Sequence, residues 1–115
     1  MSIATQCLFC RIVAGEVPAD RVAENADAIA FRDINPQAPL HALVVPREHH
    51  ADVAQLAATD PRLLAAVVAL ADQVAGTEAD GQYRLVFNTG PEAGQSVFHV
   101  HAHVLGGAQL GWHPA

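Results

Sequence analysis

Three histidines near the C-terminal end of the chain alternate with apolar residues, at His99, His101 and His103. Successive side chains of a β-strand point to opposite faces, so a strand over Val97–Leu105 would place the three imidazoles on one face. Imidazoles are polar, titrate near neutral pH and need partners when buried, so such a row does not serve packing alone. A neutral imidazole is a good nucleophile toward phosphorus, and a neighbouring imidazole can carry a proton. The pattern therefore indicates phosphoryl or nucleotidyl transfer that does not need magnesium.

Small residues flank this expected strand, with Gly94-Gln95-Ser96 before it and Gly106-Gly107 after it. Glycines allow a ligand to approach the backbone closely, and loop amides can bind phosphate oxygens. The alternative interpretation is an exposed strand face that happens to be rich in histidine, or an adventitious metal chelate. The strict alternation of three histidines between glycines favours the functional interpretation.

Two cysteines form a Cys7-x-x-Cys10 pair, which is a weak metal-binding signal by itself. Structural zinc is held by four Cys or His ligands in tetrahedral geometry, and the further candidates are His49 or His50 and His99. Because the N-terminal residues show no export signal, a metal or redox role is favoured over a structural disulfide. The alternative is a pair of reduced cysteines in an apolar turn.

The remaining residues predict a small antiparallel sheet with one main helix. The helix is expected over Pro61–Ala75, because Asp60 can cap it, apolar residues recur at helical spacing and Gly76 suits its C-terminal stop. The apolar face of the last strand is expected to pack on this helix. The strands are expected over Arg21–Glu24, Ala28–Arg32, Ala42–Val45, Tyr83–Phe87 and Val97–Leu105, and a short helix or turn over Cys7–Glu16. Most connections are too short for parallel crossovers, so the expected class is α+β.

The composition favours one compact domain over residues 1–115, since 51% of the 115 residues are hydrophobic. Six basic residues, all arginine, stand against twelve acidic ones, and the resulting charge of −6 disfavours a long nucleic acid as partner. The lack of lysine excludes a Schiff-base or P-loop lysine. The longest apolar run, Leu63–Ala71, is far shorter than the ~20 residues of a spanning helix. We therefore expect no membrane segment and a cytoplasmic location.

Residues 99–105, His-Val-His-Ala-His-Val-Leu, match the motif of the histidine triad (HIT) superfamily, which the chain resembles over nearly its whole length. The similar segments are 7–18, 31–39, 41–49 and 94–112. Ser96 and Gly106-Gly107 are similar to the Hint branch of purine nucleoside phosphoramidases, whereas Fhit-like dinucleoside polyphosphate hydrolases typically carry threonine and Pro-Arg there. The resemblance implies a HIT-like fold with a five-stranded antiparallel sheet, one main helix and a short N-terminal helix. It also implies a homodimer whose sheets join into one of ten strands, with Trp112 reaching toward the partner's site.

The resemblance gives the histidines separate roles. It implies that His101 attacks the α-phosphorus and forms a nucleotidyl-imidazole intermediate, which water then hydrolyses. His103 would hold a non-bridging phosphate oxygen, and His41 would lie behind the triad and orient it. Ser96 and Asn88 would contact the phosphate or the leaving amine. From the residues alone, Ser96 could be a loop hydroxyl, Asn88 a turn residue and His41 a surface residue.

The resemblance also implies a nucleoside site. Asp33 would accept hydrogen bonds from the ribose hydroxyls, a role that suits a carboxylate. Phe9, Phe31 and Ile34 would enclose the base, and Gln95 belongs to the same nucleotide-binding set. From the residues alone, Asp33 could cap the turn that follows it, and the three apolar residues could be plain core.

In relatives with the N-terminal cysteine pair, the resemblance implies a zinc ion held by Cys7, Cys10, His49 and His99, which makes His99 structural; His50 could replace His49. The implied function is hydrolysis of purine nucleoside phosphoramidates or acyl-adenylates to AMP or GMP. The alternatives are a dinucleoside polyphosphate hydrolase, and a non-catalytic, zinc-held protein that binds nucleotides in a regulatory role.

Overall fold

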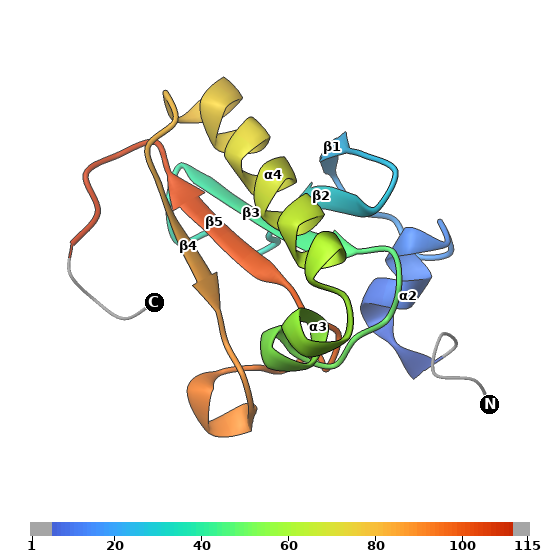
Figure 1. Cartoon of the computed structure of the whole chain (residues 1–115). Helices are drawn as coiled ribbons and strands as arrows, with labels where there is room; N and C mark the ends of the chain where they lie inside the picture. The colour runs from blue at the N-terminus through green and yellow to red at the C-terminus, as the bar shows by residue number, and fades with distance from the viewer. Residues whose placement is uncertain (1–5, 112–115) are drawn as a thin grey trace.

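The computed structural model describes residues 6–111 and contains a five-stranded, fully antiparallel sheet in the order β1-β2-β3-β5-β4 (Figure 1). The strands are β1 (Arg21–Glu24), β2 (Ala28–Arg32), β3 (Leu40–Pro46), β4 (Tyr83–Phe87) and β5 (Ala102–Gly106). The helices are α2 (Leu8–Val13), α3 (Val53–Thr59) and α4 (Pro61–Glu78), with a short 3-10 helix η1 (Pro91–Ala93). The predicted α+β class, five-stranded sheet, main helix and short N-terminal helix are confirmed.

The two faces of the sheet have different covers. On one face, alternate strand residues such as Val44 and Val104 pack against the apolar side of α4, including Val67 and Leu70. Figure 1 shows α4 lying across this face, as predicted for the apolar side of the last strand. On the other face, α2 covers only β2 and part of β3, and the rest of that face carries the candidate site.

Helix α4 begins as predicted, because the Asp60 carboxylate accepts a hydrogen bond from the backbone N–H of Leu63 at 3.2 Å. The predicted stop at Gly76 is wrong, since the helix continues to Glu78. A glycine inside an exposed helix costs only about 1 kcal/mol, which the last turn tolerates. The chain reverses instead at Asp80 and Gly81, which have φ of 52° and 75°.

The predicted strand over Val97–Leu105 is wrong at its start, because β5 begins only at Ala102. The ladder between β3 and β5 starts at the pair Val44 and Ala102. Upstream of that pair, the backbone N–H of Val100 donates instead to His50, at 2.7 Å. The segment before β5 therefore bends onto the loop that follows β3, and His99 and His101 lie outside the regular strand.

Helix α3 was not predicted. The Asp52 carboxylate caps it by accepting from the backbone N–H of Gln55 at 2.9 Å, and Leu56 is its one buried residue. A helix with a single buried residue leaves no periodic apolar stripe in the sequence.

Among the described residues, no helix is both long and apolar enough to cross a membrane. Trp112, which the sequence resemblance directs toward a partner's site, lies outside the described residues.

Candidate active site

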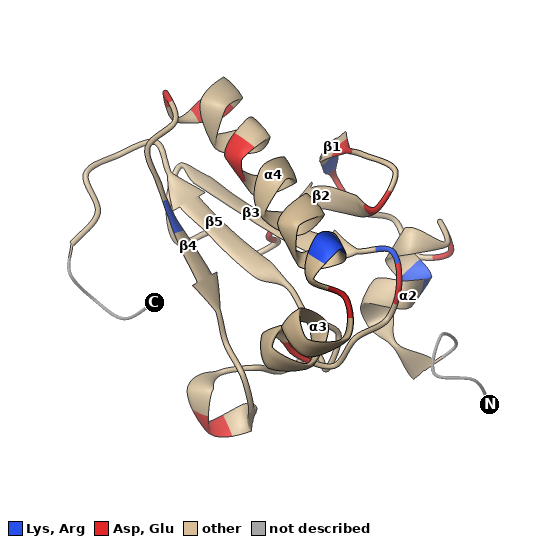
Figure 2. Cartoon of the chain, viewed as in Figure 1, with Lys and Arg blue, Asp and Glu red and all other residues tan. Residues whose placement is uncertain are grey.

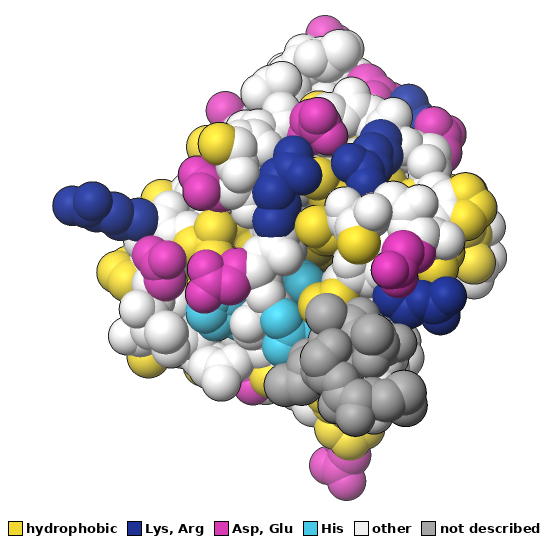
Figure 3. All heavy atoms as spheres, turned by 90° about the vertical axis from the view of Figure 1, so that its right-hand side faces the viewer, with side chains coloured by type: hydrophobic (Ala, Val, Ile, Leu, Met, Phe, Trp, Pro, Cys, Tyr) yellow, Lys and Arg dark blue, Asp and Glu magenta, His cyan; other side chains and the backbone are white. Residues whose placement is uncertain are grey.

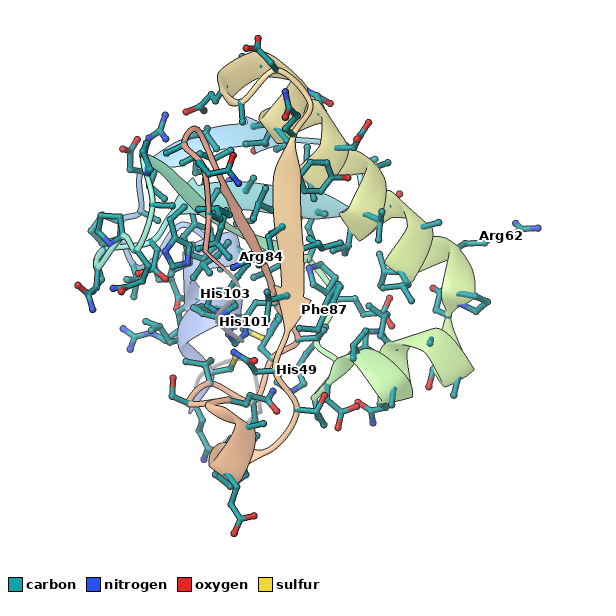
Figure 4. All side chains as sticks on the ribbon, turned by 90° about the vertical axis from the view of Figure 1, so that its left-hand side faces the viewer. His49, Arg62, Arg84, Phe87, His101 and His103 are labelled. Carbon is teal, nitrogen blue, oxygen red and sulfur yellow. The ribbon has the colours of Figure 1, made fainter. Side chains whose placement is uncertain are left out.

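His101 and His103 form the centre of the candidate site, at the start of β5. Their ring centroids lie 5.2 Å apart. The ring of Phe9, from α2, packs edge to face against His101 with a centroid distance of 5.0 Å. In Figure 4 the labelled side chains of Arg84, His103, His101 and His49 follow one another from top to bottom. Figure 3 shows histidine side chains reaching the surface among hydrophobic and acidic ones. His103 is partly exposed and lines a cavity, so a ligand can reach that ring.

The hydrogen bonding of His101 fixes which nitrogen is available. Its Nδ1 lies 2.9 Å from the carbonyl oxygen of His99 and must donate a proton to it. In the neutral ring, Nε2 then carries no proton and keeps its lone pair. Burial lowers the pKa of His101 below its usual value. His101 therefore offers an unprotonated nitrogen at neutral pH.

A second chain of hydrogen bonds fixes His103. The backbone N–H of Gln37 donates to Nδ1 of His41 at 3.0 Å, so the proton of neutral His41 is on Nε2. That nitrogen lies 3.0 Å from Nδ1 of His103 and donates a hydrogen bond to it. The proton of the neutral His103 ring is therefore on its Nε2. Burial, together with His101 and His41, lowers the pKa of His103 to about 4. His103 is therefore a neutral ring with an N–H donor on the side away from His41.

Asp33 lies beside the His41–His103 hydrogen bond, and its two carboxylate oxygens have different partners. One carboxylate oxygen accepts from the backbone N–H of Asn35 at 2.8 Å, which is the turn cap that the sequence left open. The other lies 3.4 Å from Nε2 of His41. Asp33, His41 and His103 are close enough to suggest a metal site, but the proton on Nε2 of His41 leaves no lone pair there for an ion. His41 itself is buried, so its interpretation as a surface residue is wrong.

Two cavities lie near the histidines, one lined by Phe9, which contacts His101, and the other by His41 and His103. The first has a volume of about 500 Å³ and includes all four residues predicted to surround the nucleoside, with Ser96 at its wall. These four residues are Phe9, Phe31, Asp33 and Ile34. Phe9 and Phe31 are buried and contact each other edge to face, whereas Ile34 is fully exposed at the rim. Mostly apolar walls, with the Asp33 carboxylate as an acceptor and Asp20 and Arg32 as further charged groups, suit a nucleoside base and its sugar.

The second cavity has a volume of about 400 Å³, and His103 lines it. Asn88 lines it together with His41 and His103, so the structure places Asn88 and Ser96 at different cavities. Arg84 also lines it, and sequence analysis missed this residue. Its position on the histidine side of the sheet follows only from the pairing of β4 with β5, which the sequence does not show.

Gln95 is buried and its side-chain amide binds backbone on three sides. It accepts from Gly90 at 2.9 Å and donates to the carbonyls of Ala51 at 2.7 Å and Val97 at 3.1 Å. These bonds join the loop after β4 to the start of α3. Gln95 thus holds the loop that presents the exposed Ser96.

A cluster of thiols and imidazoles lies at the other end of the row. Nδ1 of His99 is 3.5 Å from Sγ of Cys7 and 3.4 Å from Sγ of Cys10, and Nδ1 of His49 is 3.3 Å from Sγ of Cys10. Tetrahedral zinc, with bonds of about 2.3 Å to sulfur and 2.0–2.1 Å to nitrogen, would separate such ligand atoms by about 3.6 Å. These three separations are close to that value, and all four ligand atoms lie within 4.8 Å of one another.

The protonation of His99 fits the same purpose. Its Nε2 donates to the carbonyl oxygen of Pro46 at 2.8 Å, so Nδ1 keeps a lone pair facing the thiols. Burial lowers the pKa of His99 to about 4, and burial together with Cys7 raises the pKa of Cys10 to about 11. A cation would reverse the second effect and favour the thiolate. His50 is not part of the four-atom cluster. Its Nε2 lies 3.2 Å from the Glu48 carboxylate instead.

Comparisons with known proteins agree over most of the chain. A family model described as "HIT domain" matches residues 14–110. A HIT-like protein of Synechococcus elongatus is 42% identical over 108 residues, covering 93% of this chain and 95% of that protein. A HIT family hydrolase from Legionella pneumophila has 45% identity and a TM-score of 0.88, over 95% of this chain and 99% of the other. A zinc-bound histidine triad family protein from Mycobacterium smegmatis has 35% identity and a TM-score of 0.77, over 90% and 76% of the two chains.

Proposed function

The chain belongs to the histidine triad (HIT) family, and we propose that it hydrolyses purine nucleoside phosphoramidates or acyl-adenylates through a nucleotide bound covalently to His101. One observation carries this proposal. The hydrogen bond from Nδ1 of His101 to the carbonyl of His99 leaves Nε2 unprotonated, and that ring lies next to His103 and in contact with Phe9, which lines the first cavity. A neutral, oriented imidazole is the group that can attack phosphorus without a metal.

The reaction has two displacement steps. Nε2 of His101 forms a bond to the α-phosphorus while the bond from phosphorus to the leaving nitrogen or carboxylate oxygen breaks. An amine takes up a proton from solvent as it departs, whereas a carboxylate needs none. Water then forms a bond to phosphorus, the bond to His101 breaks, and the nucleoside monophosphate is released. The N–H on Nε2 of His103, held in place by His41, donates to a non-bridging oxygen and stabilises its charge in both steps. The net reaction consumes one water.

The first cavity supports the nucleoside part of the proposal. Phe9 and Phe31 offer apolar surface to a purine ring, with Ile34 at the rim. Asp33 lines the same cavity, and its partly exposed carboxylate can accept from ribose hydroxyls. Ser96 stands at the wall and would reach the phosphate or the leaving amine. We propose that Gln95 acts indirectly, by holding the Ser96 loop.

We further propose that Cys7, Cys10, His49 and His99 hold a structural zinc ion. The support is the spacing of the four ligand atoms and the lone pair that His99 directs at the thiols. When bound, the ion would join α2 to the loop after β3 and to the segment before β5. Since Phe9 of α2 contacts His101, these ligands also support one wall of the active site.

The predicted homodimer, single domain and cytoplasmic location stay predictions.

The experiment that tests this function compares wild type with His101→Ala on adenosine 5′-phosphoramidate. We expect kcat/KM to fall by at least about a thousandfold, because no other side chain replaces the nucleophile. AMP affinity, measured by calorimetry, should change only a few-fold, since the cavity that would hold the nucleoside stays intact. Full turnover by a pure His101→Ala preparation would contradict the proposal. AMP binding with no turnover by the wild type would favour a non-catalytic nucleotide-binding protein.

A further inference from the structure

A third cavity opens beside the four-atom cluster of thiols and imidazoles. It has a volume of about 480 Å³, and Cys7 and His49 are the two members of the cluster that line it. The apolar side chains of Leu8 and Phe98 line the same cavity and are 44% and 53% exposed. A small solute can therefore reach Cys7 from this side, whereas Cys10 does not line the cavity.

The two cysteines are the only ones in the chain, and both are free thiols. Cys7 caps the N-terminus of α2, and its sulfur accepts a hydrogen bond from the backbone N–H of Cys10 at 3.4 Å. Residues three apart in a helix have Cα atoms about 5 Å apart, inside the range of about 4.4–6.8 Å that a disulfide spans. The two sulfur atoms lie within 4.8 Å of each other. A disulfide can therefore form by rotation of the two side chains, with little movement of the helix.

The reduced sulfurs join α2 to the two histidines of the cluster. Both sulfurs lie within 3.5 Å of Nδ1 of His99, and the sulfur of Cys10 lies 3.3 Å from Nδ1 of His49. A disulfide sulfur has no proton to donate to these nitrogens, and it is no longer a thiolate, the form that binds a metal. Disulfide formation would thus remove two hydrogen-bond donors and two metal ligands in one step.

These contacts bear on the candidate active site through α2. Phe9 stands between the two cysteines in the sequence, and its ring packs edge to face on His101 at 5.0 Å and on His99 at 6.0 Å between centroids. The helix that carries the thiols therefore also carries one wall of the first cavity.

We infer that Cys7 and Cys10 are a redox modification site, at which a peroxide forms a reversible disulfide that abolishes metal binding and breaks the contacts of α2 with the two histidines of the cluster. The third cavity gives the peroxide access to Cys7, and Cys10 is the resolving thiol. The disulfide forms from thiols of the chain itself, and only the release of metal rests on the proposed zinc site. The nucleotide chemistry at His101 takes no part in it.

The oxidation has two displacement steps. The Cys7 thiolate attacks one oxygen of hydrogen peroxide, the O–O bond breaks, and hydroxide leaves. The Cys10 thiolate then attacks the sulfur of the resulting sulfenic acid, the S–O bond breaks, and a second hydroxide leaves. Each hydroxide takes a proton from solvent, so the two sulfurs together lose two electrons and the peroxide becomes two waters. The one charged residue of α2, Arg11, is basic and blue in Figure 2, so no acidic side chain of this helix opposes the thiolates.

The main test treats zinc-loaded, reduced wild type with hydrogen peroxide. Intact mass, peptide mapping and a chromogenic zinc indicator follow the reaction. We expect the loss of two hydrogen atoms per chain, on the peptide that holds both cysteines, with one zinc ion released per disulfide. Dithiothreitol should restore the thiols and the capacity to bind zinc.

Two matched variants test access through the third cavity. In Cys10→Ser, the oxidised Cys7 has no resolving thiol, and dimedone should trap it as the sulfenic acid. In Cys7→Ser, the sulfenic acid can form only on Cys10. We expect trapping on Cys7 to be at least about threefold faster, since oxidation follows exposure. Equal or reversed rates would overturn the cavity as the route of the oxidant.

Hydrogen exchange tests the effect on α2. It compares the oxidised and reduced forms of metal-free wild type, so that only the disulfide differs. Amides of α2 should exchange about two- to tenfold faster in the oxidised form, the range for the loss of one net hydrogen bond. Amides of α4, which packs on the opposite face of the sheet, are the internal control and should not change.

Each other outcome overturns a defined claim. Thiols that stay reduced, or that yield only irreversible sulfinic acids or disulfides between two chains, overturn the modification site. A disulfide in protein that keeps its zinc, or in which α2 exchanges no faster, overturns the coupling of the thiols to the metal or to the helix. A disulfide in protein that never binds zinc overturns the proposed zinc site and the claim of metal release with it. No readout depends on turnover, so a failure of the proposed hydrolysis would be seen separately, in the assay of His101→Ala.

Discussion

His41 offers a direct test of how the fold controls the protonation of the candidate site. Its ring is buried, accepts from the backbone N–H of Gln37 at 3.0 Å and lies 3.0 Å from Nδ1 of His103. The substitution His41→Ala removes the donor that keeps the proton of His103 on Nε2. Among the described residues, His41 is the hydrogen-bond partner of Nδ1 of His103, so its removal leaves the ring free to change tautomer.

The size of the effect follows from these contacts. A neutral hydrogen bond contributes about 0.5–1.5 kcal/mol net, so the preference of His103 for the Nε2–H form should fall about two- to twelvefold. Since only that form can donate to the phosphate oxygen, and a ring without preference is in that form half of the time, kcat/KM should fall by up to about twofold, far less than in His101→Ala. Truncating a buried ring should also lower the free energy of unfolding by about 2–4 kcal/mol.

The assay combines imidazole nitrogen NMR, which distinguishes the two tautomers, with kcat/KM on adenosine 5′-phosphoramidate. Leu70→Ala is the matched control, because it destabilises the packing of α4 by about 2–5 kcal/mol on the opposite face of the sheet. It should change neither the His103 tautomer nor the rate by more than its unfolded fraction explains. If His41→Ala keeps His103 fully in the Nε2–H form, or if Leu70→Ala slows turnover equally, the proposed control by His41 is refuted.

Two further predictions concern the metal cluster and pH. Metal analysis should find one zinc ion per wild-type chain and none in His49→Ala. His50→Ala, which removes the adjacent imidazole outside the four-atom cluster, should retain the ion, so zinc loss in both variants or in neither would contradict the assignment. The pKa of His103 falls from 6.5 to about 4 on folding, so the unfolded chain binds more protons in that window and the free energy of unfolding should fall as pH drops from 6.5 toward 4. In urea unfolding of metal-free protein, His103→Gln should reduce that slope by up to about 1.4 kcal/mol per pH unit, and an unchanged slope would show that His103 is not the titrating group.

Much of the sheet could be predicted because its signals are local. The strands β1 and β2 match their predicted ranges, and the turn between them forms where expected, since the Asn25 side chain accepts from the backbone N–H of Asp27 at 2.9 Å and of Ala28 at 2.8 Å. The start of β5 could not be predicted in this way. It depends on where β3 stops pairing and on a bond from Val100 to His50, and both are contacts between distant parts of the chain.

The candidate site shows the same division. The alternation of the histidines indicates the chemistry. In the structure, however, His99 lies in the thiol cluster, whereas His101 and His103 lie side by side. The regular spacing of the three histidines in the sequence does not by itself predict that they divide between two sites. The tautomers depend on backbone partners, such as Gln37 for His41, that only the folded chain brings together. The position of Arg84 beside the site depends on strand register, and a shift by one residue would place it on the α4 face.

The most direct measurement of the central claim is to quench the reaction of wild type with adenosine 5′-phosphoramidate in its first turnover and to map the protein by mass spectrometry. The account predicts the mass of one adenylyl group on the peptide that contains His101, decaying as AMP is released. An adduct on another residue, or AMP formed at full rate with no adduct at any time, would contradict it.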